Sequence, residues 1–291
     1  MPIIEIFNFR VSSFLLFVYL GFWAGFAFAW FRLKSKKLPR FFFPKLIVLT
    51  LSGAFIGAKT YYLIQHPDWF WEDPFDAFFS LFGSGWFGGF LLCTFLVVLY
   101  FRKMCLPVLH FADIIIPAIP LGIIFGRIGC FLAGDGCYGL PTEVPWGMSF
   151  PHGAVPTLLT VHPTPLYEAL ANLVIFMCLI RLNKTALPDG SVLATYLILS
   201  SAARFLVEFL RLNPIALWGL TAPQLISLCL LTGGGFILWR VRSVHNNLQE
   251  SLNHHNRKGK RYANKKISIR GRMHAGKLGR ANTAIQDLCA N

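Results

Sequence analysis

The sequence predicts an all-α, polytopic membrane protein with about seven transmembrane helices and an outer cap. The first observation is composition: 55% of the 291 residues are hydrophobic and only 14% are charged, whereas soluble domains carry about 25% charged residues. The second is that apolar runs of roughly 20 residues, the length needed to cross a bilayer, recur along the chain. Because lipid offers no partners to backbone polar groups, these runs are expected to be helices.

Seven apolar segments define the expected bundle. They are residues 11–31, 46–65, 85–101, 111–132, 166–180, 190–210 and 218–239. Two loops on the outer side stand out. The loop 66–84, aromatic and acidic, is expected to form an outer arm or lateral gate, with a simple interfacial belt as the favoured alternative. The Gly- and Pro-rich segment 133–165 is expected to form a periplasmic cap. We therefore predict one transmembrane domain over 1–240 and a basic, disordered cytoplasmic tail over 241–291.

The distribution of basic residues predicts the orientation of the bundle. Of the 27 Lys and Arg residues, 22 fall on one side of seven spans, in segments 32–45, 102–103 and 181–184 and from residue 240 onward. The charged residues of the loops on the opposite side are mostly acidic. The positive-inside rule then places the N-terminus outside and the C-terminus in the cytoplasm. Because topology accounts for the net charge of +14, no nucleic-acid partner is predicted.

Three basic residues depart from this pattern, since Lys59, Arg127 and Arg204 lie within predicted spans near the outer leaflet. An ionisable residue inside a membrane span points by default to a functional site. The alternative is a structural ion pair, or a side chain that extends to the headgroups. Three cations at one depth favour the functional interpretation.

The sixth span carries a charged stripe. Arg204, Glu208 and Arg211 follow at helical spacing on one face, and such a face must point to the bundle interior or to a water-filled cavity. Because a guanidinium matches phosphate oxygens, we expect an outer cavity for a phospholipid headgroup. The alternative is a closed Arg–Glu network that only orients helices. The polar residues expected at this depth are Arg127, Arg204, Arg211, Asp135, Glu168, Glu208 and His162.

The cysteine pattern predicts no metal site. The seven are dispersed along the chain, without a pair at metal-ligand spacing. Cys130 and Cys137 both fall near the outer face, where a disulfide is an open alternative. Phosphate-binding loops and dinucleotide fingerprints are missing from the sequence. We therefore predict no metal and no cofactor.

Several motifs resemble one family. The run Gly-Arg-Ile-Gly-Cys-Phe-Leu-Ala-Gly over 126–134, followed by Tyr-Gly-Leu-Pro-Thr over 138–142, is similar to the signature of bacterial prolipoprotein diacylglyceryl transferases. Three further matches stand in family order, at residues 113–122, 162–168 and 204–211. The chain is thereby identified as a member of this family.

The resemblance implies a transferase of the bacterial inner membrane. Family members transfer diacylglycerol from phosphatidylglycerol to the lipobox cysteine thiol of a prolipoprotein, which forms a thioether and releases glycerol phosphate. This is the first step of lipoprotein maturation. The implied partners are phosphatidylglycerol, a prolipoprotein signal peptide with its lipobox cysteine, and membrane lipids. Arg127 resembles the family's phospholipid-binding arginine, and Arg204 its second essential arginine.

The resemblance and the charge pattern together predict two sets of site residues. The candidate catalytic residues are Arg127, Arg204, Asp135 and Glu208. The candidate phosphatidylglycerol-binding residues are Arg127, Arg204, Arg211, Glu168, His162 and Tyr138.

The general base is not assigned by the sequence. One family form has a histidine directly before two glycines in the third span, and Phe87 stands at that position here, before Gly88 and Gly89. The alternatives for the base are Asp135, Glu168, Glu208 and His162. For His162, a packing role before Pro163 is slightly favoured over a role as the base.

Two other functions remain as alternatives. A phospholipid-binding relative without a base would keep the arginines and lack turnover. A small-solute transporter would show internal repeats with broken helices, and the sequence has no convincing repeat.

Overall fold

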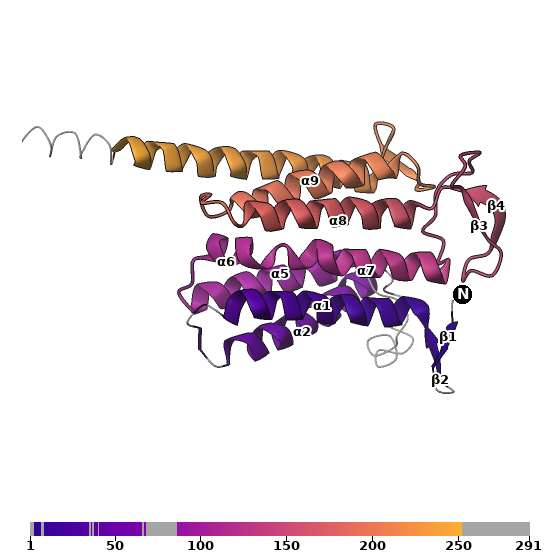
Figure 1. The fold of residues 1–291 in the computed structure, drawn as a ribbon, viewed down its shortest axis with the longest axis horizontal. Helices are drawn as coiled ribbons and strands as arrows, with labels where there is room; N and C mark the ends of the chain where they lie inside the picture. The colour runs from indigo at the N-terminus through magenta and orange to yellow at the C-terminus, as the bar shows by residue number, and fades with distance from the viewer. Residues whose placement is uncertain are drawn as a thin grey trace, which may run out of the picture. The chain divides into compact units, whose positions relative to one another are not determined.

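The computed structural model describes residues 3–6, 9–34, 41–65 and 86–251, with positions 36, 38, 39 and 67. The chain divides into two compact units, residues 1–238 and 239–291. In the first unit long helices run side by side (Figure 1). The helices are α1 (Ser13–Lys34), α2 (Phe42–Gln65), α5 (Trp86–Lys103), α6 (Val108–Ile115), α7 (Ala118–Ala133), α8 (Thr164–Leu182) and α9 (Ser191–Glu208), followed by a C-terminal helix, Ala222–Ser251.

The multi-pass helical architecture is confirmed. Six helices in the described part of the chain are long and apolar enough to cross a membrane, so the count of seven is not confirmed. One of these spans, Val108–Ala133, contains both α6 and α7. The two helices meet at Pro117, because a proline has no backbone N–H to donate and so interrupts the helical hydrogen bonds.

In the described residues three short hairpins lie at the ends of helices, and the sequence does not predict them. They pair β1 (Ile3–Ile6) with β2 (Phe9–Ser12), β3 (Met148–Phe150) with β4 (Thr157–Val161), and β5 (Ile215–Leu217) with β6 (Leu220–Thr221). All three pairs are antiparallel. The β3–β4 hairpin forms part of the predicted cap, segment 133–165 (Figure 1).

Two predicted regions fall largely outside the described residues. Of the loop 66–84, the structure describes only Pro67. Of the tail, it describes the residues up to Ser251. The predicted tail begins at residue 241, but the C-terminal helix continues to Ser251. Residues 241–251 contain neither Gly nor Pro, and a helix need not end where its apolar part ends.

Glycines bring the helices of the bundle into backbone contact. A Cβ atom at Gly57 of α2 would overlap the carbonyl oxygen of Gly88 in α5, and one at Gly88 would overlap that of Gly57. A Cβ atom at Gly21 of α1 would lie 2.8 Å from the carbonyl oxygen of Gly122 in α7. Small residues at such positions let membrane helices approach closely.

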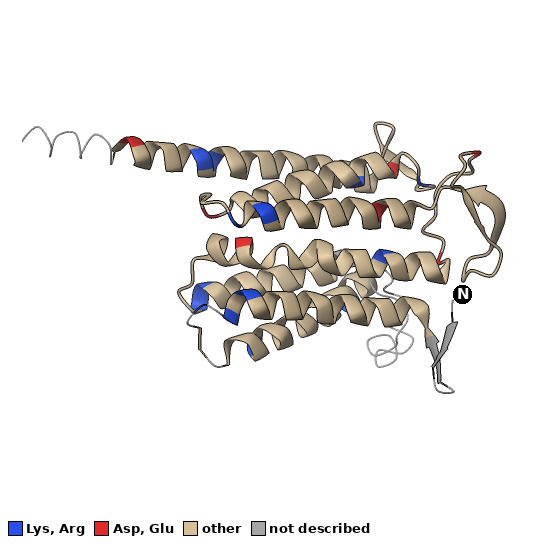
Figure 2. Ribbon diagram, viewed as in Figure 1, with Lys and Arg blue, Asp and Glu red and all other residues tan. Residues whose placement is uncertain are grey.

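An aromatic core joins four helices at the end of the bundle that carries basic residues. The Phe42 ring lies 5.8 Å from that of Phe101 and 6.4 Å from that of Phe111, and Leu33 completes the contact with α1. The last turns of α1 and α5 are basic, and Figure 2 shows Lys and Arg gathered at this end.

Asp113 of α6 holds the start of α9. Its side chain is buried, and its two carboxylate oxygens accept hydrogen bonds from the backbone N–H groups of Gly190 (2.7 Å) and Leu193 (2.8 Å). The first N–H groups of a helix have no partner within it, and a carboxylate there also meets the positive end of the helix dipole. Asp113 thus fixes α9, which carries two of the predicted site residues, to the first half of the bundle.

We predict that Gly57→Ala destabilises the protein by about 1–3 kcal/mol, because the added methyl group forces α2 and α5 apart. The thermal midpoint in detergent measures the effect. Gly235→Ala is the matched control, since a Cβ atom there meets nothing within 4 Å. Equal midpoints for the two variants would contradict the close packing of α2 on α5.

Candidate functional site

Glu168 is the centre of a cluster of arginines. It lies in α8, and its side chain is 7% exposed. One carboxylate oxygen pairs with Nε of Arg127 from α7. The other lies 2.6 Å from Nη1 of Arg204, from α9, and 3.1 Å from Nη1 of Arg211, just after α9. The cluster therefore joins three helical segments through one carboxylate.

Glu208 is the second carboxylate of the cluster. Its side chain is fully buried, with Oε2 2.8 Å from Nη2 of Arg204. Its Oε1 accepts hydrogen bonds from Asn213 Nδ2 (2.5 Å) and Thr221 Oγ1 (2.9 Å). Thr221 directly precedes the C-terminal helix and exchanges hydrogen bonds with Gln224, in the arrangement of a capping box. Glu208 thus fixes the Arg204 guanidinium relative to the start of that helix.

The cluster has an excess of one positive charge, because three arginines face two carboxylates. The carboxylates are buried, whereas the side chains of Arg127 and Arg204 are 25% and 28% exposed. A guanidinium has five N–H donors, and the contacts with Glu168 and Glu208 use only some of them. The exposed donors are suited to binding an anion.

The predicted cap is fixed to the end of α9 beside Arg211. The backbone N–H of Leu140 donates to the carbonyl oxygen of Leu210 (2.8 Å), and Gly139 pairs with Arg211 in an antiparallel bridge. A Cβ atom at Gly139 would overlap the Leu210 carbonyl oxygen. Only a glycine therefore permits this approach of the cap to the cluster.

His162 and Tyr138 make their hydrogen bonds at the cap rather than with the carboxylates of the cluster. Nδ1 of His162 lies 3.2 Å from the Tyr167 hydroxyl, which also accepts a hydrogen bond from Trp146 Nε1 (2.7 Å). The Tyr138 hydroxyl donates to the carbonyl oxygen of Val155 (2.8 Å). Both side chains therefore shape the cap in the described part of the chain.

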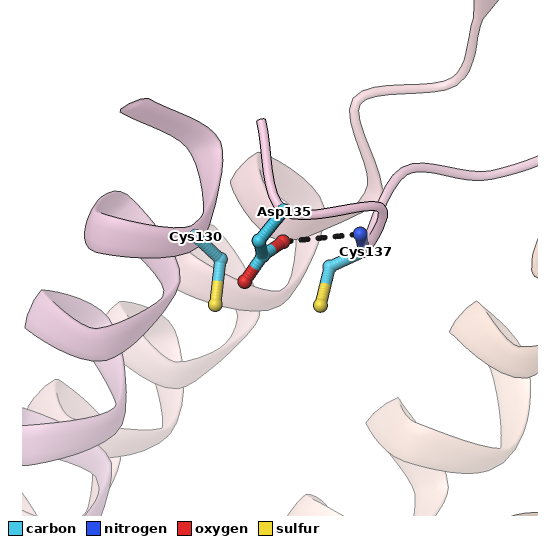
Figure 3. Close-up of side chains that lie close together, drawn as sticks. All are labelled: Cys130, Asp135 and Cys137. Carbon is cyan, nitrogen blue, oxygen red and sulfur yellow. Dashed lines mark hydrogen bonds between the residues drawn. The ribbon is translucent and has the colours of Figure 1, made fainter. Parts of the chain in front are cut away.

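Asp135 lies between two cysteines (Figure 3). Its Oδ1 accepts a hydrogen bond from the backbone N–H of Cys137 (3.1 Å). Ligand atoms of Cys130, Asp135 and Cys137 all lie within 4.8 Å of one another, and both cysteines are free thiols. A hydrogen bond with Cys130 and the nearby charge of Arg211 lower the pKa of Cys137 to about 7. From the sequence, only the two cysteines are expected near one another, since a disulfide between them is an open alternative. The position of Asp135 between them is not expected.

The fold thus gathers five of the predicted site residues in one cluster and places Asp135 next to it, through Cys137 and Arg211. Sequence reasoning missed Asn213 and Thr221 as partners of Glu208. The only feature of the sequence that could have indicated this role is that both residues are polar and lie next to a predicted span. Phe87 lies in the first turn of α5, and its side chain is outside the described part of the structure.

Comparison with known proteins agrees with the resemblance noted in the sequence. The family described as Prolipoprotein diacylglyceryl transferase matches residues 2–240. A relative from Chlorobaculum tepidum is 31% identical over 238 residues, which cover 74% of this chain and 81% of the relative. A relative from Clostridium tetani is 29% identical over 237 residues, which cover 80% of this chain and 94% of the relative.

Both relatives are named phosphatidylglycerol–prolipoprotein diacylglyceryl transferase. So is one from Bordetella avium, which is 36% identical over 197 residues that cover 65% of this chain and 73% of the relative. The predicted transferase identity and multi-pass membrane architecture are therefore confirmed. The chain belongs to the prolipoprotein diacylglyceryl transferase family.

Proposed function

We propose that the protein transfers diacylglycerol from phosphatidylglycerol to the lipobox cysteine thiol of prolipoproteins. The C–O bond between diacylglycerol and phosphate breaks and a C–S bond forms. Glycerol phosphate leaves with the electron pair, and the thiol releases its proton to water. The observation that carries this proposal is the arginine cluster around Glu168, with its excess positive charge. The names of the relatives support the choice of substrates.

Arg127 and Arg204 are proposed to bind the phosphate. Their side chains are the most exposed of the cluster, and they come from different helices, so a phosphate can be held from two sides. Negative charge grows on the leaving phosphate as the C–O bond breaks. Donors fixed in advance around that charge stabilise the transition state more than the ground state.

Glu168, Glu208 and Arg211 are proposed to position these two arginines. Glu168 contacts all three arginines, and Glu208 holds Arg204 from the other side. Preorganisation requires that the donors be held by their own partners before the substrate arrives. Both carboxylates are therefore engaged with arginine, which disfavours either as the general base.

Asp135 is proposed to contact the acceptor cysteine. It is partly exposed, and it lies beside Cys137, whose thiol is near Arg211. A thiol that reaches Asp135 is thus adjacent to the proposed phosphate site.

His162 and Tyr138 are proposed to shape the headgroup pocket through the cap, because their hydrogen bonds fix Tyr167 and the segment near Val155.

We further propose that residues 1–240 form the transferase unit in the bacterial inner membrane, with the N-terminus outside and the C-terminus in the cytoplasm. The basic last turns of α1 and α5 support this orientation, by the positive-inside rule. The arginine cluster then lies near the outer leaflet, on the side where a secreted prolipoprotein emerges.

The proposed activity predicts that purified protein releases glycerol phosphate from phosphatidylglycerol only when a lipobox peptide is present. A peptide with serine in place of the lipobox cysteine is the control and should give no release, because the proposed nucleophile is the thiol. Lipid binding without turnover would instead favour a non-catalytic relative, the alternative suggested by Phe87 at the position of the family histidine.

Arg127→Ala should lower kcat/KM by about 100-fold or more, since it removes a phosphate donor. Arg181→Ala is the matched control, because Arg181 is exposed in the last turn of α8, the helix that carries Glu168. The same release assay measures both. Near-normal turnover by Arg127→Ala would exclude its role in phosphate binding.

Glu208→Gln should lower both the thermal midpoint and kcat, because the neutral amide cannot form the ion pair with Arg204 and the buried site loses about 1–3 kcal/mol. Glu143→Gln in the exposed part of the cap is the control and should change neither. A loss of kcat without any change in midpoint would contradict the positioning role and indicate direct participation in the reaction.

A further inference from the structure

Two thiols and a carboxylate converge just after α7. Cys130 is in the last turn of α7 and is buried, and Asp135 and Cys137 follow in the turn. Their ligand atoms lie within 4.8 Å of one another, and Figure 3 shows both sulfurs and the carboxylate directed to the same side.

The backbone of this turn is fixed by several contacts. Gly134 and Gly136 adopt positive φ angles of 58° and 85°, a conformation that side chains oppose. A Cβ atom at Gly134 would lie 2.7 Å from Cα of Gly153. The Thr164 hydroxyl donates to the carbonyl oxygen of Cys137 (2.6 Å). The three side chains are therefore held together by the fold rather than by a flexible loop.

We propose that Cys130, Asp135 and Cys137 bind a soft divalent metal ion of the zinc class through two thiolates and one carboxylate. Thiolates select such ions. Zinc–sulfur bonds of about 2.3 Å in a tetrahedral site put two sulfurs about 3.8 Å apart, so the observed spacing requires only small side-chain rotations. The backbone N–H of Cys137 donates a hydrogen bond to Asp135. In metal sites, hydrogen bonds of this kind orient the ligand carboxylate toward the ion.

The surrounding charge suits such an ion. Two thiolates, one carboxylate and a divalent cation carry a net charge of −1. The neighbouring cluster has an excess of one positive charge, and its Arg211 lies beside Cys137. The negative charge of the occupied site would therefore lie beside the Arg211 guanidinium, which stabilises it.

Three protein ligands leave a tetrahedral ion one further position, as in catalytic zinc sites. Given the proposed function, this position is able to take the acceptor thiol. The thiol would bind as a thiolate and release its proton to water. Such binding would supply the activation that the family histidine, replaced by Phe87, does not provide here.

Cobalt(II) titration of the untagged, full-length protein in detergent tests the site. We expect one equivalent to bind with a thiolate-to-cobalt charge-transfer band, and zinc to displace it. Cys137→Ser should remove at least half of the band, because one of the two thiolates is lost, and Asp135→Asn should weaken affinity about tenfold or more. Cys178→Ser in α8 is the control and should leave the band unchanged.

Absence of the band, or a band of undiminished intensity in Cys137→Ser, would overturn the proposal. So would a Cys130–Cys137 disulfide as the state of the protein purified without reductant, detected by alkylation and mass spectrometry. The titration does not depend on turnover. If the protein binds metal but is inactive, only the proposed function is contradicted. If the protein is active but binds no metal, only this inference is contradicted.

Discussion

The contact of Glu168 with three arginines is the interaction on which the rest of the structure depends. Three guanidiniums at one depth of a membrane protein repel one another unless anions lie between them. Glu168 and Glu208 neutralise two of the charges and remain buried. The third charge stays without a matching carboxylate in the described cluster. This excess, on partly exposed Arg127 and Arg204, leaves guanidinium donors for an anion and is the basis of the proposed phosphate site.

The scaffold holds this cluster from both ends. At the far end, Asp113 fixes the start of α9 through Gly190 and Leu193. At the near end, the cap pairs with Arg211 through Gly139. Glycine contacts hold α2 against α5. The contacts at both ends of α9 fix the helix that carries Arg204, and this favours a preorganised site.

Much of this arrangement is predictable from the sequence. Hydropathy predicts the spans, and the spacing of Arg204, Glu208 and Arg211 predicts their shared face. The short hairpins are missed, because strands of two to five residues carry too little periodicity. The meeting of Cys130, Asp135 and Cys137 is also missed, since it depends on the left-handed turn at Gly134. The partners of His162 depend on the register of the cap, which hydropathy does not specify.

The position of the headgroup phosphorus in an experimental structure with bound phosphatidylglycerol tests the central claim most directly. The account predicts phosphate oxygens within hydrogen-bond distance of the Arg127 and Arg204 guanidiniums, with Glu168 still paired to Arg211. A phosphate bound elsewhere, with both guanidiniums occupied only by Glu168 and Glu208, would contradict it.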